Sequence, residues 1–339
     1  MDVLLDIVGF AGKGLIVVIA VAACAAIVLS LIRPSRRAAS RDGRLVIRRL
    51  NDSMRRAADA LQAAALPPKE SKRRSKALAK ARKKEQRPSR NVFVLDFKGD
   101  ILASAVDSLR QEVSALLAAA GKDDEVVLRL DSPGGTVPNY GLAASQLDRL
   151  KQGGLQLTVC VDKVAASGGY LMACVADQIL AAPFAVVGSI GVVAPLPNLH
   201  RLLERHGVDY ENLTAGEHKR PVSFLAKIDE AGRRKYQEQL DETHALFKGF
   251  VHEHRPDLDV EQVATGDYWH GTRALELGLV NRLVTSDDYL MSKLDEANLL
   301  HLAFQRPRSL RDRVAGAAGQ ISAQIADRLW ARALQEPRP

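Results

Sequence analysis

A serine and a lysine 52 positions apart have the residue types of a nucleophile and its base. Ser167 lies in the segment Asp-Lys-Val-Ala-Ala-Ser-Gly-Gly-Tyr, and Lys219 lies in Leu-Thr-Ala-Gly-Glu-His-Lys-Arg. A serine hydroxyl is a weak nucleophile at neutral pH and needs a base beside it. A lysine amine accepts a proton only when it is neutral, and burial in a dry cleft favours the neutral form. The pair predicts nucleophilic catalysis with Ser167 as the nucleophile and Lys219 as the base.

Each of these residues also has an ordinary structural interpretation. Ser167 precedes a helix pattern and is suited to cap that helix. Lys219 lies in a polar segment, where a solvated surface lysine is the usual case. His218, next to Lys219, is a second candidate for the base. The pattern as a whole favours Lys219.

Glycines near Ser167 provide the complement that such a nucleophile needs. Residues 131–137 have the sequence Asp-Ser-Pro-Gly-Gly-Thr-Val and follow an apolar strand pattern, so backbone N–H groups are left at the carboxyl edge of a sheet. We expect the N–H groups of Gly135 and Gly168 to form an oxyanion hole, with Gly134 in the same oxyanion and substrate-binding turn. The glycines after Ser167 allow a close approach of substrate. A plain turn is the alternative for Gly134 and Gly135.

These residues must be positioned by a scaffold in which strands and helices alternate. Such alternation is typical of an α/β fold with a largely parallel sheet. We expect strands at 91–97, 125–130, 155–161, 178–182 and 186–193. We expect helices at 50–65, 108–120, 141–151, from about 167, at 229–255 and at 309–334.

Five segments, in this order and spacing, resemble the S49 peptidases, the family of signal peptide peptidase A and, more closely, the membrane-anchored SohB proteases. They are the strand and turn at 130–135, the nucleophile segment at 164–170, Val-Gly-Ser-Ile-Gly-Val at 187–192, the lysine segment at 214–220, and the closing stretch with Trp-His-Gly at 269–271 and Gly-Leu-Val at 278–280. The resemblance covers roughly residues 91–284.

The resemblance implies a ClpP/crotonase-like spiral of β-β-α units and a Ser-Lys dyad. Ser167 would form an acyl-enzyme, Lys219 would act as the base, and Ser189 would orient Lys219. It also implies a homo-oligomeric ring and substrates such as signal-peptide remnants or misfolded and membrane-associated proteins. Tyr170 is a candidate for the wall of the substrate cleft.

Residues 14–32 form an apolar run without any charge. At 1.5 Å per residue, a helix of this length spans a hydrocarbon core of about 30 Å. A cleaved signal peptide is the alternative, but only Lys13 precedes the run, and the run is longer than a signal-peptide core. We therefore expect a short N-terminal tail at 1–13 and a single transmembrane helix at 14–32, in a bacterial inner membrane.

The basic charge of the chain is concentrated in residues 33–90. This segment has 20 Lys and Arg against 5 Asp and Glu, or +15, whereas the whole chain has +8, so the rest has −7. We expect a basic juxtamembrane linker, with two alternatives for its role: a solvated linker or helix, and a segment that attracts anionic lipid headgroups. We expect no nucleic acid as partner. The positive-inside rule places the following domain in the cytoplasm, whereas S49 members are often periplasmic.

The remaining expectations concern boundaries and exclusions. The peptidase domain is predicted at 91–285, and a C-terminal helical extension at 286–339. Cys24, Cys160 and Cys174 show no disulfide or metal spacing, so we expect no cofactor and no metal. Two functions compete with a peptidase: an acyl-CoA enzyme of the crotonase class, and a non-catalytic membrane scaffold with the same fold.

Overall fold

The computed structural model describes residues 43–84, 88–216, 219 and 221–305. The segments predicted as the membrane helix, 14–32, and as the C-terminal helix, 309–334, lie outside the described residues. Among the helices of the described part, none is long and apolar enough to cross a bilayer.

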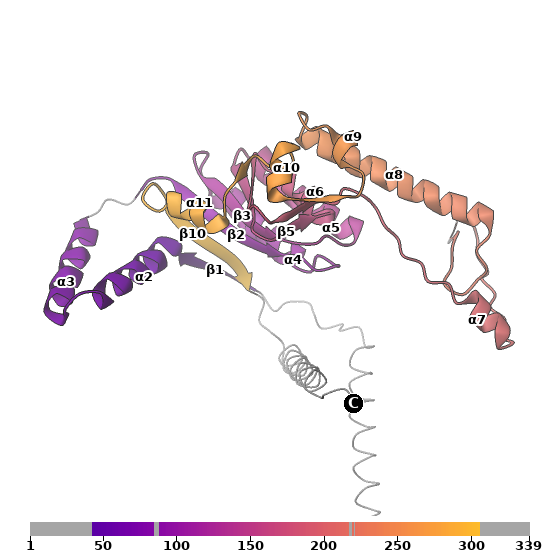
Figure 1. Ribbon diagram of the computed structural model, residues 1–339, viewed down its shortest axis with the longest axis horizontal. Helices are drawn as coiled ribbons and strands as arrows, with labels where there is room; N and C mark the ends of the chain where they lie inside the picture. Colours follow the sequence, from indigo (N-terminus) through magenta and orange to yellow (C-terminus); the bar gives the residue numbers. More distant parts are fainter. Residues whose placement is uncertain (1–42, 85–87, 217–218, 220, 306–339) are drawn as a thin grey trace, which may run out of the picture. The chain divides into compact units, whose positions relative to one another are not determined.

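A seven-stranded sheet forms the centre of the described chain (Figure 1). Its order is β1-β10-β2-β3-β4-β6-β9, and every neighbouring pair is parallel except β1 with β10. The strands are β1 (Arg44–Arg49), β2 (Asn91–Lys98), β3 (Glu125–Asp131), β4 (Gln156–Val161), β6 (Gln178–Ala181), β9 (Arg282–Leu283) and β10 (Asn298–Gln305). The α/β class and the largely parallel sheet are confirmed.

Two apolar clusters cover the two faces of this sheet, because side chains alternate along each strand. The larger cluster joins Leu95 and Leu128 of the sheet to α4 (Val106–Ala119) and α5 (Val137–Gln152). The smaller cluster joins Val94 to α11 (Ser286–Ser292), with α2 (Leu50–Ala64) packed against it.

A second, three-stranded sheet carries the segments of chemical interest. β5 (Val164–Ala166) pairs in parallel with β7 (Val186–Gly188), and β7 pairs antiparallel with β8 (Tyr268–His270). The short helix α6 (Gly168–Ala173) follows β5 directly. The strand predicted at 186–193 therefore ends five residues early, since Gly188 and Ser189 both have positive φ angles that turn the chain out of the sheet.

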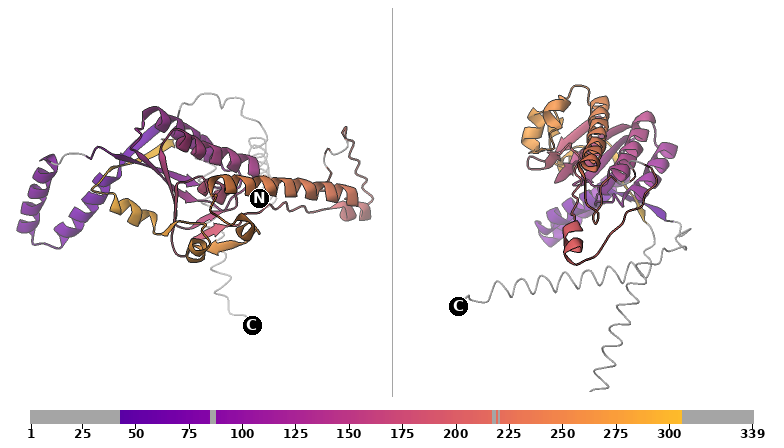
Figure 2. Two further views of the ribbon diagram at one scale, coloured as in Figure 1. Left: turned by 90° about the horizontal axis from the view of Figure 1, so that it is seen from above. Right: turned by 90° about the vertical axis from the view of Figure 1, so that its right-hand side faces the viewer.

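The long helix α8 (Glu230–His254) lies within the predicted range 229–255, and Asp229 caps it through the N–H of Gly232. Val251, near its end, is its one side chain that is fully buried in the described part of the chain. Figure 2 shows α8 running past the sheet, and α7 (His200–Arg205) lies near its N-terminal end.

The sheet reaches beyond the motif-bearing range 91–285 at both ends. β1 lies in the predicted linker, and β10 is a strand in the stretch that we expected to be helical. β1 pairs along its whole length with β10, and β10 pairs with β2. Because these partners are some 200 residues or more apart along the chain, no local periodicity indicates the pairing. The other elements are α3 (Pro68–Lys84), α9 (Val260–Val263) and α10 (Gly271–Glu276).

Candidate active site

Ser167 lies at the junction of β5 and α6, in a backbone conformation that is rare for a residue with a side chain. Its φ is 52° and its ψ is −121°. The backbone N–H of Ser167 donates to the carbonyl of Gly188 at 2.8 Å, which fixes the junction against the end of β7. Ser167 makes no side-chain capping bond to α6, so the capping interpretation is wrong. Strain of this kind persists only where the surroundings impose it, and it is typical of functional sites.

The glycine turn after β3 lies directly against Ser167. A Cβ placed on Gly134 would lie 2.7 Å from the backbone nitrogen of Gly168 and 2.8 Å from Cβ of Ser167. A Cβ on Gly135 would collide with the carbonyl of Ile101. Among the described residues, neither the N–H of Gly135 nor that of Gly168 has a hydrogen-bond acceptor. Two free donors thus remain beside the serine, which is the requirement for an oxyanion hole.

A buried chain of hydroxyl groups supports the glycine turn. The Tyr140 hydroxyl donates to the carbonyl of Asp100 at 2.8 Å, so the Ser132 hydroxyl donates to Tyr140 at 2.6 Å. The Ser132 oxygen then accepts the N–H of Gly134 at 3.1 Å. Burial raises the pKa of the Tyr140 hydroxyl, which keeps it protonated as a donor.

The tyrosine ring and Ser132 also position the first turn of α6. Gly168 packs on the ring of Tyr140, and Gly169 packs on the carbonyl of Ser132. Tyr140 is not among the site residues predicted from the sequence. The one available signal was its place on the predicted helix after the glycine turn, which does not distinguish it from an ordinary core tyrosine.

A cavity of about 220 Å³ opens beside Ser167 and Gly168. Its walls come from α5, α6, the segment after β7, and α8. The apolar side chains that line it are Val137, Leu171, Val192, Leu246, Phe247 and Phe250. An apolar cavity next to a nucleophile and two free N–H groups suits the side chain of a bound peptide.

Tyr170 does not line this cavity, so that prediction was wrong. Its side chain is fully buried, and its hydroxyl donates to the carbonyl of Leu279 at 3.0 Å. In a helix that starts at Gly168, position 170 faces the interior of the domain.

Ser189 follows Gly188, the residue that holds the backbone of Ser167. Its φ is 51°, it is half-buried, and its N–H donates to the carbonyl of Asp267 at 2.7 Å. The structure thus brings Ser189 into the neighbourhood of Ser167.

Lys219 lies in the segment between α7 and α8 and is exposed to solvent. Its backbone N–H donates to the carbonyl of Gly216 at 3.2 Å, and its side chain has no hydrogen bond or ion pair within the described chain. His218 lies outside the described residues. Ser167, the three glycines and Ser189 are therefore gathered at one place, whereas Lys219 is solvated in a separate turn. No group of three or more His, Cys, Asp or Glu side chains in the described part is arranged to hold a metal ion.

Two family models match consecutive parts of this chain, from residue 2 to residue 300. The model of the peptidase family S49 N-terminal region matches residues 2–147, and the model of peptidase family S49 matches residues 149–300.

Curated proteins with high identity are named as proteases. A probable protease SohB of Haemophilus influenzae is 57% identical over 219 residues, which are 65% of this chain and 62% of the relative. A probable protease SohB of Buchnera aphidicola subsp. Acyrthosiphon pisum is 51% identical over 224 residues, or 66% of this chain and 67% of the relative. The chain thus aligns with about two thirds of the length of these relatives.

Similarity to solved structures is more distant. A membrane-bound stomatin-specific protease in complex with a substrate peptide matches at 14% identity and a TM-score of 0.41, over 68% of this chain and 98% of that one. An enoyl-CoA hydratase/isomerase from Marinobacter aquaeolei matches at 15% identity and a TM-score of 0.36, over 62% of this chain and 73% of that one.

Proposed function

This chain belongs to peptidase family S49, and from that premise we propose that it is a membrane-anchored serine endopeptidase with a Ser-Lys dyad. The observation that carries the proposal is the position of Ser167. Its strained backbone lies against two free N–H groups and beside an apolar cavity, and a serine that only capped a helix would need neither.

The proposed reaction follows from these positions. The Ser167 hydroxyl oxygen attacks the carbonyl carbon of the scissile peptide bond and passes its proton to the Lys219 amine. The negative oxygen of the tetrahedral intermediate accepts the N–H groups of Gly135 and Gly168. The C–N bond breaks, and the leaving amine takes the proton from Lys219. Lys219 then takes a proton from a water molecule, whose oxygen adds to the ester carbon. The bond from that carbon to the Ser167 oxygen breaks, and the serine oxygen takes the proton back from Lys219. Ser189 orients Lys219 through a hydrogen bond.

This mechanism requires that the Lys219 turn meet a serine. The Lys219 side chain is exposed in the described structure, whereas a base that takes the Ser167 proton must lie within hydrogen-bond reach of that hydroxyl. Either the turn closes over Ser167 of its own chain, or it reaches Ser167 of a neighbouring copy in the proposed homo-oligomeric ring. In the first case substrate binding would complete the site, and in the second case assembly of the ring would complete it.

The proposed substrates are signal-peptide remnants and misfolded or membrane-associated proteins in the bacterial inner membrane. The apolar cavity beside Ser167 supports this choice, because segments that leave a membrane are rich in apolar side chains. The ClpP/crotonase-like spiral and the transmembrane helix at 14–32 belong to the same proposal.

Hydrolysis by the full chain in nonionic detergent tests the dyad. We expect cleavage of casein, and covalent labelling by a serine-directed phosphonate that is lost in Ser167→Ala. Lys219→Ala should lose both while its thermal unfolding remains that of the wild type. Wild-type activity in Lys219→Ala would mean that another residue is the base, and His218 would be the next candidate. If the wild type neither cleaves nor reacts, the non-catalytic scaffold takes the place of the peptidase.

A further inference from the structure

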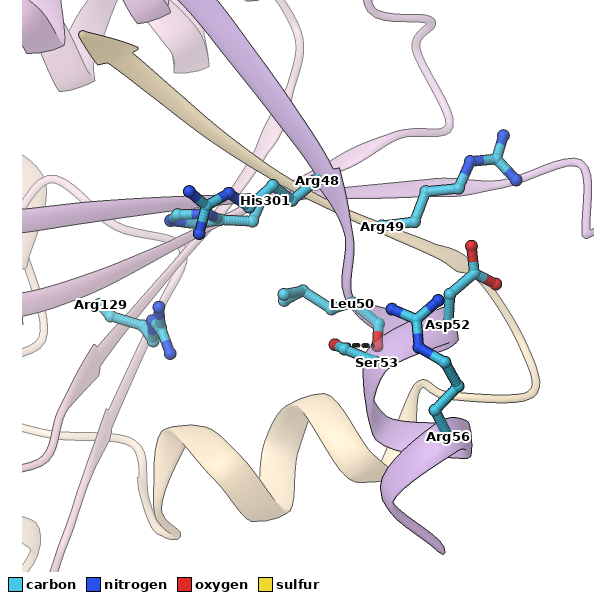
Figure 3. A pocket seen from close by; sticks show the side chains of 8 residues that line it. All are labelled: Arg48, Arg49, Leu50, Asp52, Ser53, Arg56, Arg129 and His301. Atoms are coloured by element: carbon cyan, nitrogen blue, oxygen red, sulfur yellow. Dashed lines mark hydrogen bonds between the residues drawn. The ribbon is translucent and has the colours of Figure 1, made fainter. Parts of the chain in front are cut away.

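A basic pocket of about 650 Å³ that does not include Ser167 opens where β1 meets α2. It is formed partly by the linker and partly by the sheet of the peptidase (Figure 3). Its lining residues are Arg48, Arg49, Leu50, Asp52, Ser53, Arg56, Arg129 and His301. The pocket is therefore a composite that exists only because β1 pairs with β10.

The register of the strands explains why these side chains meet. Arg48 of β1 lies opposite His301 of β10, and Asp96 of β2 lies opposite Arg129 of β3. The same face of β2 carries the apolar Val94 two residues earlier, within the smaller cluster. Toward the carboxyl ends of the strands this face thus changes from apolar to charged, and the first turns of α2 border the charged part.

Charge in the pocket is unbalanced. Asp96 pairs with both Arg129, at 2.6 Å, and His301, at 2.9 Å. Asp52 is the other carboxylate at the pocket. Arg48, Arg49 and Arg56 have no acidic partner within 4.0 Å in the described part of the chain.

The three unpaired arginines differ in direction. In Figure 3 the Arg48 side chain extends over His301, and Arg56 approaches from α2 beside Ser53 and Asp52. Arg49 lies at the rim and points away. Arg48 and Arg56 are thus the guanidinium groups that are best placed to meet a ligand inside the pocket.

We propose that this pocket binds the phosphate group of an anionic membrane lipid. Planar guanidinium groups match the oxygen atoms of a phosphate, and a charge-assisted bond of this kind is among the strongest hydrogen bonds. The volume is in the range of sites for organic ligands, and a lone phosphate ion would leave most of it empty. A glycerophosphate headgroup fits that volume better.

The position of the pocket along the chain favours a lipid as the source of the phosphate. The charge-free run at 14–32, which we predict to span the membrane, ends twelve residues before Arg44. Twelve residues span at most about 40 Å when fully extended, so a membrane-spanning run at 14–32 would tether β1 within that distance of the bilayer. The inference thus rests on the predicted membrane helix and is independent of the peptidase mechanism.

Calorimetric titration of the full chain in nonionic detergent tests the proposal, with dihexanoyl phosphatidylglycerol as the probe. Dihexanoyl phosphatidylcholine is the zwitterionic control. We expect the wild type to bind the glycerol lipid in preference to the choline lipid. The pair Arg48→Gln with Arg56→Gln should weaken binding at least about tenfold, because each lost charged hydrogen bond has that order of effect.

A control pair of variants distinguishes lipid binding in the pocket from attraction by the overall positive charge of the segment. Arg44→Gln with Arg73→Gln removes two exposed positive charges from the same basic segment without touching the pocket, and it should change binding less than about twofold. Circular dichroism and thermal unfolding of each variant check that it is folded. Arg129 is left in place, since its loss would leave Asp96 without its closest partner.

Five results would overturn the proposal. Equally weak lipid binding by both pairs of variants would mean that the lipid is attracted by the overall positive charge and not by the pocket. Equal affinity for the choline lipid would mean that the pocket does not distinguish an anionic headgroup from a zwitterionic one. Displacement of the lipid by inorganic phosphate at the same concentration would identify a soluble anion as the ligand, and displacement by a single-stranded oligonucleotide would identify nucleic acid. Absence of binding in the wild type would end the hypothesis.

Discussion

Gly134 lies so close to Ser167 that no side chain fits between them. A Cβ on Gly134 would be 2.8 Å from Cβ of Ser167, and the φ of Gly134 is +89°. Both the space and the backbone conformation therefore require glycine. The turn after β3 and the nucleophile after β5 are in this way held in one arrangement, although they are 33 residues apart.

Gly134→Ala should abolish most of the activity. The added methyl group must push Gly168 or Ser167 out of position, and we expect kcat to fall about 100-fold or more, as when an oxyanion donor is lost. Backbone strain should also lower the free energy of unfolding by about 1–3 kcal/mol. Steady-state kinetics on a fluorogenic peptide and thermal unfolding measure the two effects.

Gly154→Ala is the matched control for that change. Gly154 has a φ of +81°, but a Cβ there meets nothing within 4 Å. We expect a similar loss of stability from the φ angle with kcat unchanged. If Gly154→Ala loses as much activity as Gly134→Ala, backbone strain, and not a change in the geometry of the site, explains the loss of activity in Gly134→Ala.

Ser132→Ala should lower kcat about tenfold without a comparable rise in KM. The variant removes the acceptor for the N–H of Gly134 and the partner of the Tyr140 hydroxyl, which also costs about 1–3 kcal/mol of stability. Tyr140→Phe keeps the bond between Ser132 and Gly134, so its kcat should fall less. Equal kcat values for the wild type and Ser132→Ala would show that the hydroxyl chain does not position the turn.

The scaffold around these residues was predictable where its patterns are local. Strands such as 91–97 and 125–130 are apolar runs bounded by turn residues, and the structure has them within one residue. The pairing of β1 with β10 was not predictable, because Arg44 and Gln305 meet only through the tertiary fold.

The candidate site likewise has residues that the sequence predicts and residues that it does not. Ser167, Gly134 and Gly168 are recognisable from the sequence since each needs a special backbone or a special side chain at one position. Tyr140 and Phe250 were missed because a core aromatic and a cavity wall have the same local pattern. The exposed side chain of Lys219 was not brought to Ser167 by any local pattern, because the sequence does not specify the conformation of the segment between α7 and α8.

Gly141→Leu should change the substrate preference of the proposed peptidase. Gly141 lines the cavity beside Ser167, and a Cβ there meets no atom within 4 Å. A leucine would fill the cavity without strain and favour helix α5 by up to about 1 kcal/mol. We expect KM to rise at least tenfold for peptides with a large apolar residue before the scissile bond, and to change little for alanine at that position.

Gly249→Leu is its control. Gly249 also lies in a helix with open space around it, but it is exposed and outside that cavity. Its peptide preference should equal that of the wild type. An unchanged preference in Gly141→Leu would mean that substrate side chains bind elsewhere.

Asn51→Ala should detach the linker from the sheet. The Asn51 amide donates to the carbonyls of Leu294 and Ala297, and its oxygen accepts the N–H of Leu299. Three bonds at the start of α2 thus hold the linker to the segment before β10 and to its first residues, and their loss should cost about 1–3 kcal/mol. Hydrogen exchange should become faster in β1 than in β3. Uniform protection in β1 and β3 would contradict this role for Asn51.

The carboxylate of Asp96 should make stability depend on pH in the acid range. Burial raises its pKa, but hydrogen bonds from His301 and Arg129 outweigh that effect and lower the pKa from 3.8 to about 2. A carboxyl group whose pKa is lower in the folded state stabilises the fold above its unfolded pKa. This contribution is therefore complete above about pH 4 and is lost as the pH falls toward 2.

Thermal unfolding between pH 5 and pH 2.5 should show a shallower decline of stability in Asp96→Asn than in the wild type. Asp123→Asn, at an exposed turn, should follow the wild type. Parallel curves for the wild type and Asp96→Asn would mean that the pairing with Arg129 and His301 does not contribute to stability.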